Sequence, residues 1–107
     1  MRLKKEPFEK IKNGRKKIEM RLYDEKRRQI SIKDYIIFES FENKEKLKVR
    51  VINIMSFSNF DELYLYYNKK ELGYLKEQVA SADDMNQYYS YEEIKRYGVV
   101  ALELEVI

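Results

Sequence analysis

The sequence has no cysteine, histidine, threonine or tryptophan among its 107 residues, and only one proline and three glycines. Without cysteine there are no disulfides, thiolate nucleophiles or cysteine-ligated metals. Without histidine there are no Ser-His-Asp or Cys-His catalytic sites and no histidine-ligated zinc. Lysine, arginine, carboxylates, serine, tyrosine and backbone amides remain, a set suited to anion binding or to acid–base work by lysine and carboxylate. We expect neither a metal nor a cofactor, because the acidic pair Asp83-Asp84 lacks a third ligand at fixed spacing.

Long apolar runs are also lacking. No window approaches the roughly 18 consecutive apolar residues of a membrane-spanning helix. The basic start at residues 1–5 is not followed by the apolar segment of a signal peptide. We therefore expect a cytoplasmic protein with no membrane partner. The length suits one domain, and no repeat or linker divides the chain, so we expect a single domain over residues 1–107.

The net charge of +3 is distributed unevenly along the chain. Residues 1–50 hold 17 Lys and Arg against 9 Asp and Glu, whereas residues 51–107 hold 5 against 10. A basic half of a globular domain indicates a polyanionic partner, usually nucleic acid. The alternative is an ordinary solvated surface on which basic and acidic segments pair across the fold.

The first half of the chain shows one helical segment followed by strands. Pro7 is placed as a first helical residue, and Gly14 ends that helix. From residue 17 to residue 23 apolar and polar residues alternate, which predicts a half-buried strand with one polar face. A nearly continuous apolar run over 35–38 predicts a buried strand after a charged connection at 24–29. The next strand changes its alternation near Val51, which predicts a bulge or bend.

The second half alternates helices and loop before a last strand. Asn59 with Glu62, and Ser90 with Glu93, have the spacing of capping boxes. They predict a helix over about 60–67 and another that Gly98 ends, whereas 68–87 mixes a short helix with loop. Residues 99–107 alternate again as a strand. The order predicts an α+β fold, a small curved β-sheet or barrel with helices packed at its side.

The segment Gly14-x-Lys16-x-x-Glu19-x-Arg21 resembles the G-x-K-x-x-E-x-R signature of the ASCH domain, a PUA-like β-barrel family. The similarity continues in residues 7–8, 21–24, 34–38 and 89–99, so it covers nearly the whole chain. The resemblance implies a cleft between barrel and helices, lined by the motif's Lys, Glu and Arg and proposed for RNA. RNA or a modified nucleoside is therefore the partner we expect.

The resemblance also leaves an enzyme open. Some small bacterial members are similar to amidohydrolases that deacetylate N4-acetylcytidine, and others look like ribonucleases. The amidohydrolases use the motif Lys, which Lys16 matches, and a Thr where this chain has Glu19. That mechanism cannot be carried over intact, because this chain has no threonine. A further departure is Lys33, where many relatives have Gly before the Asp matched by Asp34, and it puts the turn geometry in doubt.

The motif residues have a chemistry of their own. Glu19 and Arg21 are two apart on a strand, so they project from one face and can meet. The Arg fork can bind phosphate or carboxylate at two points, while the Glu can accept from a base amino group. If Lys16 is desolvated it can act as a general base, so Lys16 and Glu19 are the catalytic candidates if the protein is an enzyme. Gly14 permits a close backbone approach. The alternative is a surface ion pair that contributes little to stability, beside a solvated lysine.

Other residues complete the predicted binding set. Lys17 lies within the motif, and Arg28 can add a phosphate contact or belong to a solvated basic turn. Tyr89, with its neighbour Tyr88, lies outside the clear helices and is a candidate for stacking on bases. Helical core spacing instead marks four other tyrosines as packing residues: Tyr64, Tyr67, Tyr91 and Tyr97. A protein partner remains a third possibility if exposed tyrosines form an apolar patch.

Overall fold

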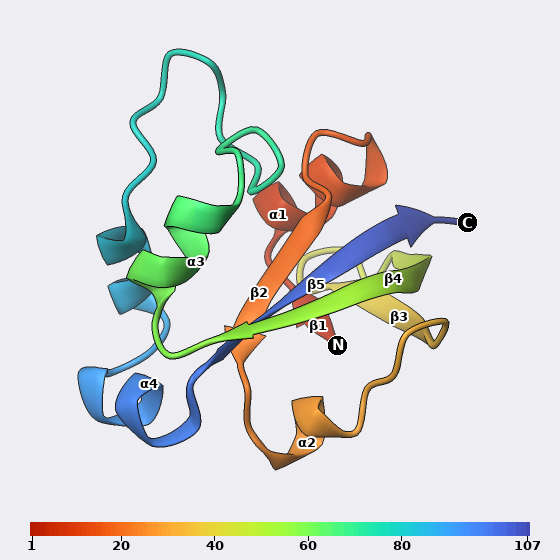
Figure 1. Ribbon diagram of the computed structural model, residues 1–107. Coiled ribbons are helices and arrows are strands. Elements are labelled where there is room, and N and C mark those ends of the chain that lie inside the picture. Colours follow the sequence, from red (N-terminus) through yellow and green to blue (C-terminus); the bar gives the residue numbers. More distant parts are fainter.

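The computed structural model describes residues 1–107 and combines a curled five-stranded sheet with four α-helices and one 3₁₀ helix (Figure 1). The strand order is β1-β3-β4-β5-β2, and only the β1–β3 pair is parallel. The sheet is an open half-barrel, so the predicted α+β class with a curved sheet and flanking helices is confirmed. The elements are β1 (Arg2–Leu3), α1 (Lys5–Lys12), β2 (Ile18–Leu22), α2 (Glu25–Arg28), β3 (Tyr35–Ser40), β4 (Lys46–Phe57), α3 (Phe60–Tyr66), the 3₁₀ helix η1 (Ala82–Gln87), α4 (Tyr91–Tyr97) and β5 (Val99–Val106).

The long strand β4 pairs with β3 on one side and with β5 on the other. Its register against β5 shifts between Val51 and Asn53, which confirms the predicted bulge. The extra residue, Ile52, is 48% exposed. A bulge adds local twist, and here it accompanies the curl of the sheet.

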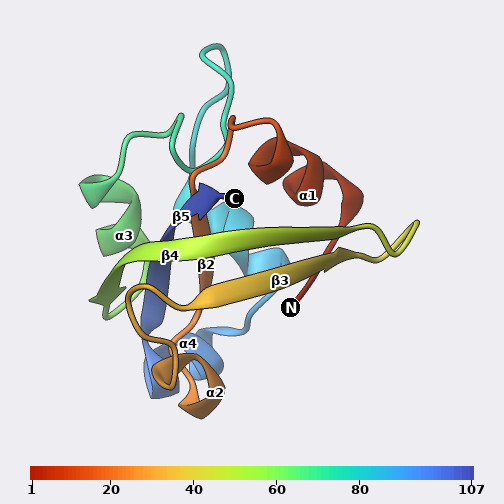
Figure 2. The same ribbon diagram turned by 90° about the vertical axis from the view of Figure 1, so that its right-hand side faces the viewer.

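Successive side chains of a strand point to opposite faces, and each face of the sheet carries a core over part of its area. Figure 2 shows α1 and α3 on opposite sides of the sheet. One core, here called the α1 core, contains Phe8 and Ile11 of α1 packed on β3, β4 and β5. The other, the α3 core, contains Phe60 and Leu63 of α3 packed on β2 and on the start of β5. Strand β5 contributes residues to both cores and therefore lies between two layers.

The helix signals were largely confirmed. Ser90 and Glu93 form both hydrogen bonds of a capping box at α4. At α3 only half of a box forms, because the Glu62 carboxylate accepts from the Ser58 amide instead of from Asn59. Helix α1 begins at Lys5, before Pro7, since proline is tolerated anywhere in a first helical turn. None of the helices exceeds α1 in length, and none could span a bilayer.

Several predictions of local structure and of burial were wrong. The connection at 24–29 contains α2, capped by the Asp24 side chain. Strand β3 is covered on one face only, so Tyr35 and Ile37 are 56% and 46% exposed. Tyr91 is 74% exposed, because no helix or strand covers that face of α4. At Lys33 the backbone adopts a φ of 81°, the region that glycine favours, so this departure from the family pattern falls at a strained turn.

Candidate functional site

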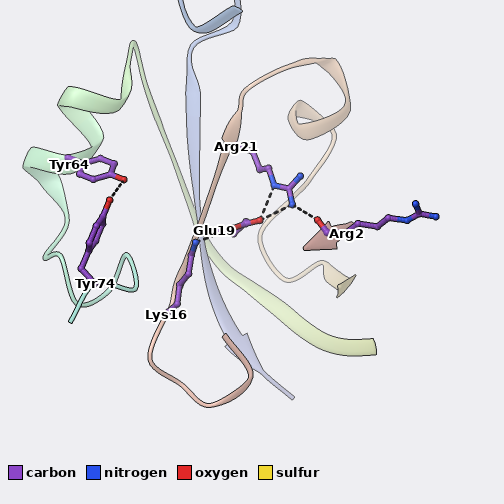
Figure 3. A network of polar contacts seen from close by, with 6 residues as sticks. All are labelled: Arg2, Lys16, Glu19, Arg21, Tyr64 and Tyr74. Atoms are coloured by element: carbon purple, nitrogen blue, oxygen red, sulfur yellow. Dashed lines mark hydrogen bonds and ion pairs between the residues drawn. The ribbon is translucent and has the colours of Figure 1, made fainter. Parts of the chain in front are cut away.

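The centre of the site is the carboxylate of Glu19 on β2, which is only 3% exposed. Both Nε and Nη2 of Arg21 lie 2.9 Å from its Oε2 atom, and Nζ of Lys16 lies 3.5 Å from its Oε1 atom (Figure 3). All three side chains are at least 84% covered. The predicted alternative of a solvated surface pair is therefore wrong. Burial makes the three charges depend on one another, since an unpaired charge in such a place is costly.

Arg21 also joins the two edges of the sheet. Its Nη2 donates to the backbone carbonyl of Arg2 at 3.1 Å. Strands β1 and β2 are the first and last in the strand order, so this contact bridges the open side of the half-barrel. The Arg2 side chain points away from Glu19 in Figure 3. The Nη1 group of Arg21 has no hydrogen-bond partner in the protein, so two strong donors remain for a ligand.

Lys16 is positioned by the turn before β2 and by a distant loop. Its amide donates to the Lys10 carbonyl at 3.0 Å. Its aliphatic stem packs against Gly73, where an added Cβ would lie 3.2 Å from Cδ of Lys16. Gly73 has a φ of +99°, a conformation that favours glycine, and an added Cβ would also be tight against the Lys16 stem. Sequence reasoning missed Gly73, although a lone glycine in an irregular segment was the available signal.

The trio lines a cavity of about 260 Å³ beside the edge of the sheet. Four basic residues line it, Arg2, Lys4, Lys16 and Arg21, and Glu19 is the one acidic residue among the lining side chains. A second cavity of about 390 Å³ adjoins the first. Both are bounded by a shared set of six residues: Lys4, Pro7, Lys16, Met20, Met85 and Tyr88.

Two tyrosines form the aromatic wall of the smaller cavity. Tyr89 stacks on Phe60 with ring centroids 6.0 Å apart and an interplanar angle of 14°. Burial raises the pKa of the Tyr89 phenol, so it stays a hydrogen-bond donor at neutral pH. Tyr88 is 49% exposed at the rim, with Nζ of Lys4 5.4 Å from its ring centre. The cavity thus combines cations, one carboxylate and aromatic surface.

The structure brings together four of the seven predicted site residues: Lys16, Glu19, Arg21 and Tyr89 all line the smaller cavity. It places the other three elsewhere. Gly14 and Lys17 border a separate hollow beside residues 70–76. Arg28 lies over the ring of Tyr23 at 4.2 Å and donates to the backbone carbonyl of Tyr97, the last residue of α4. These three face away because a turn and β2 itself separate them from the cavity.

The cavity residues that were not anticipated include Arg2, Lys4, Phe41 and Met85. They come from β1, from the residues after β1 and β3, and from η1. Each is brought to the cavity by tertiary packing. No local pattern in the sequence marks them.

Comparison with known proteins gives the family. A sequence model of the ASCH domain matches residues 1–107. The crystal structure of hypothetical protein PH0355 is similar at 43% identity and a TM-score of 0.84, over 100% of this chain and 96% of that one. The solution NMR structure of protein PF0455 from Pyrococcus furiosus is similar at 36% identity and a TM-score of 0.69, over 100% and 98%. No curated protein matches the chain. The chain belongs to the ASCH domain family of the PUA-like superfamily.

Proposed function

We propose that this ASCH domain binds single-stranded RNA by holding one nucleotide in the 260 Å³ cavity. The main support is the buried trio, in which Lys16 and Arg21 flank Glu19 and still keep donors for a ligand. The family is broadly RNA-binding in character, which agrees with this chemistry.

The charges favour an anion at the mouth of the cavity. Four basic residues line the cavity against one carboxylate, and buried charges are screened by salt much less than exposed ones. Nη1 of Arg21 can donate a charge-assisted hydrogen bond to a phosphate oxygen, while Nε and Nη2 stay engaged by Glu19. Lys4 adds a flexible charge at the rim. A phosphate of the RNA backbone is the group that these side chains suit.

The aromatic residues of the cavity suit a base. Tyr88 and Tyr89 offer ring surface, and stacking of a base on an aromatic ring contributes about 1–3 kcal/mol. The Oε1 atom of Glu19 is 3.5 Å from Lys16 and accepts no hydrogen bond in the protein, so it can accept from an amino group of a base. The cavity is smaller than the range of about 300–1,000 Å³ for drug-sized ligands, which favours a single base.

The test is binding of a labelled short single-stranded RNA, followed by fluorescence anisotropy. Lys4→Ala and Tyr88→Ala change the rim of the cavity without touching the buried trio. Each should weaken binding by about tenfold. Lys95→Ala and Tyr91→Ala are matched controls on the exposed surface of α4 and should bind as the wild type does.

Salt dependence adds a second readout to the same titration. Removing one phosphate contact to a single strand lowers the slope of log K against log salt by about 0.7. We expect that change for Lys4→Ala and none for Lys95→Ala. Equal affinities and equal slopes in the rim variants and the controls would refute the proposal.

A hydrolase is the competing function, favoured by the contact of Lys16 with Glu19 inside one cavity. However, Oε2 of Glu19 is already engaged by two nitrogens of Arg21, an arrangement typical of a counterion. Incubation with N4-acetylcytidine and with RNA across a range of pH, followed by mass spectrometry, separates the two functions. Binding alone predicts that both compounds stay intact, whereas turnover abolished by Lys16→Met would establish the enzyme.

A further inference from the structure

The adjoining 390 Å³ cavity contains a carboxylate that the site described so far does not use. We infer that Asp84 of η1 accepts a hydrogen bond from a ribose hydroxyl, which makes the site selective for RNA over DNA. This inference rests on the proposed function, because it concerns the sugar of the nucleotide whose base occupies the smaller cavity.

Asp84 is held in place by a chain of two tyrosines. The Tyr74 hydroxyl donates to Oδ2 of Asp84 at 2.6 Å and lies 2.9 Å from the Tyr64 hydroxyl (Figure 3 shows the two tyrosines). A carboxylate has no proton to give, so Tyr74 donates to Asp84, and Tyr64 in turn donates to Tyr74. Burial and these contacts raise the pKa of Tyr74 well above its ordinary range, so its proton stays in place at neutral pH. The chain joins α3, the loop after it and η1.

The other oxygen of Asp84 remains available. Oδ1 accepts no hydrogen bond within the protein, and no lysine or arginine nitrogen lies within 4.0 Å of the carboxylate. Lys10, which lines the same cavity, is already paired with Glu6 at 2.9 Å. An oriented carboxylate with a vacant oxygen suits a ligand group that donates hydrogen bonds, and it repels phosphate.

A ribose hydroxyl is the donor that the position favours. The two cavities share six lining residues, so a ligand can extend from one into the other. Figure 3 shows Lys16 between the tyrosine pair and the Glu19–Arg21 pair, and Lys16 lines both cavities. A carboxylate that binds ribose hydroxyls is a recurrent device in dinucleotide-binding folds. The 2′-hydroxyl is the group that distinguishes RNA from DNA.

The test compares single strands of one sequence as RNA, as DNA and as 2′-O-methyl RNA. For the wild-type protein we expect the affinity for RNA to exceed that for DNA by about tenfold. This is the effect expected when a ligand loses one good hydrogen bond to a charged group. The 2′-O-methyl strand should bind as DNA does, because it lacks the donor. Asp84→Ala should weaken RNA binding to the level of DNA and leave DNA binding unchanged. Tyr74→Phe should shift RNA binding in the same direction by a smaller factor.

Matched variants separate recognition from folding. Asp83→Ala changes the neighbouring acid, which is exposed as Asp84 is but lines neither cavity, and should leave the RNA-to-DNA ratio unchanged. Asp84→Asn keeps an acceptor oxygen and should keep part of the selectivity. The inference would be overturned if the wild-type protein bound RNA and DNA with equal affinity. It would also be overturned if Asp84→Ala weakened the binding of both strands equally. Either result would leave the proposed function standing. A wild-type protein that binds neither strand would overturn the proposed function itself.

Discussion

The guanidinium of Arg21 places two nitrogens 2.9 Å from one oxygen of Glu19 and leaves the other oxygen of that carboxylate facing Lys16. The same guanidinium reaches across to the carbonyl of Arg2 on the opposite edge of the sheet. One side chain thus neutralises a buried acid, closes the open side of the half-barrel and keeps donors for a ligand. Structural and binding roles meet in the same residue.

Removing the Glu19 carboxylate should lower stability strongly. In Glu19→Ala two buried cations lose their partner, and breaking a buried ionic group of this kind costs about 3–5 kcal/mol. Urea unfolding at neutral pH measures the change. The pair of exposed Glu6 with partly buried Lys10 is the control, and Glu6→Gln should cost at most about 0.5 kcal/mol. Equal losses in the two variants would mean that burial of the trio has no energetic consequence.

Gly73→Ala should displace Lys16. The new Cβ would meet the lysine stem at 3.2–3.3 Å, in a backbone conformation that L residues rarely adopt. Gly14→Ala is a close control, since Gly14 also has positive φ but open space around it. Both variants should lose about 1–2 kcal/mol of stability to backbone strain. Only Gly73→Ala should also weaken RNA binding, which anisotropy titration measures. Equal RNA affinities of the two variants would contradict this prediction.

Lys33→Gly should stabilise the fold. Lys33 has a φ of 81°, and glycine adopts this conformation without the steric cost that a Cβ brings. We expect the free energy of unfolding to rise by up to about 1 kcal/mol. The relief of backbone strain in the folded state should outweigh the entropic cost of ordering a more flexible glycine. The neighbouring change Ser31→Gly relieves no strain and should lose about 0.5–1 kcal/mol. A loss for Lys33→Gly in thermal and urea unfolding would contradict the expectation.

Stability should decline at alkaline pH through buried tyrosines. Burial and then a 2.8 Å hydrogen bond to Glu103 raise the pKa of Tyr67 well above its ordinary range. A folded-state pKa above the unfolded value of about 10 gives stability that is complete below that pH and is lost as the pH rises beyond it. Tyr67→Phe should be less stable at neutral pH but should show a shallower decline above about pH 10. Urea unfolding across the alkaline range measures both effects, and an unchanged slope would reject this role of Tyr67.

Alternation and spacing predicted much of the fold. The change of alternation at Val51 marked a real bulge, and Ser90 with Glu93 marked a real cap. Helix α2 escaped prediction because it has four residues and buries none of them, so it leaves no apolar period. Strand β3 was assigned two buried faces, whereas the curl of the sheet leaves one of them open.

Alternation along the chain also predicted part of the site. A period of two put Glu19 and Arg21 on one face of a strand, but polar side chains in that pattern do not reveal whether the face is covered. Gly73 and Lys4 reach the trio through tertiary packing, which no local spacing encodes. Conversely, Arg28 looked like a motif neighbour along the chain and lies in a different hollow.

The most direct measurement is a crystal structure of the protein with a short single-stranded RNA. We predict a base in the 260 Å³ cavity against Tyr88 and Tyr89, its amino group on Oε1 of Glu19 and a phosphate on Nη1 of Arg21. The RNA seated instead on the hollow beside Tyr23 and Arg28, with the cavity of the trio empty, would contradict the account.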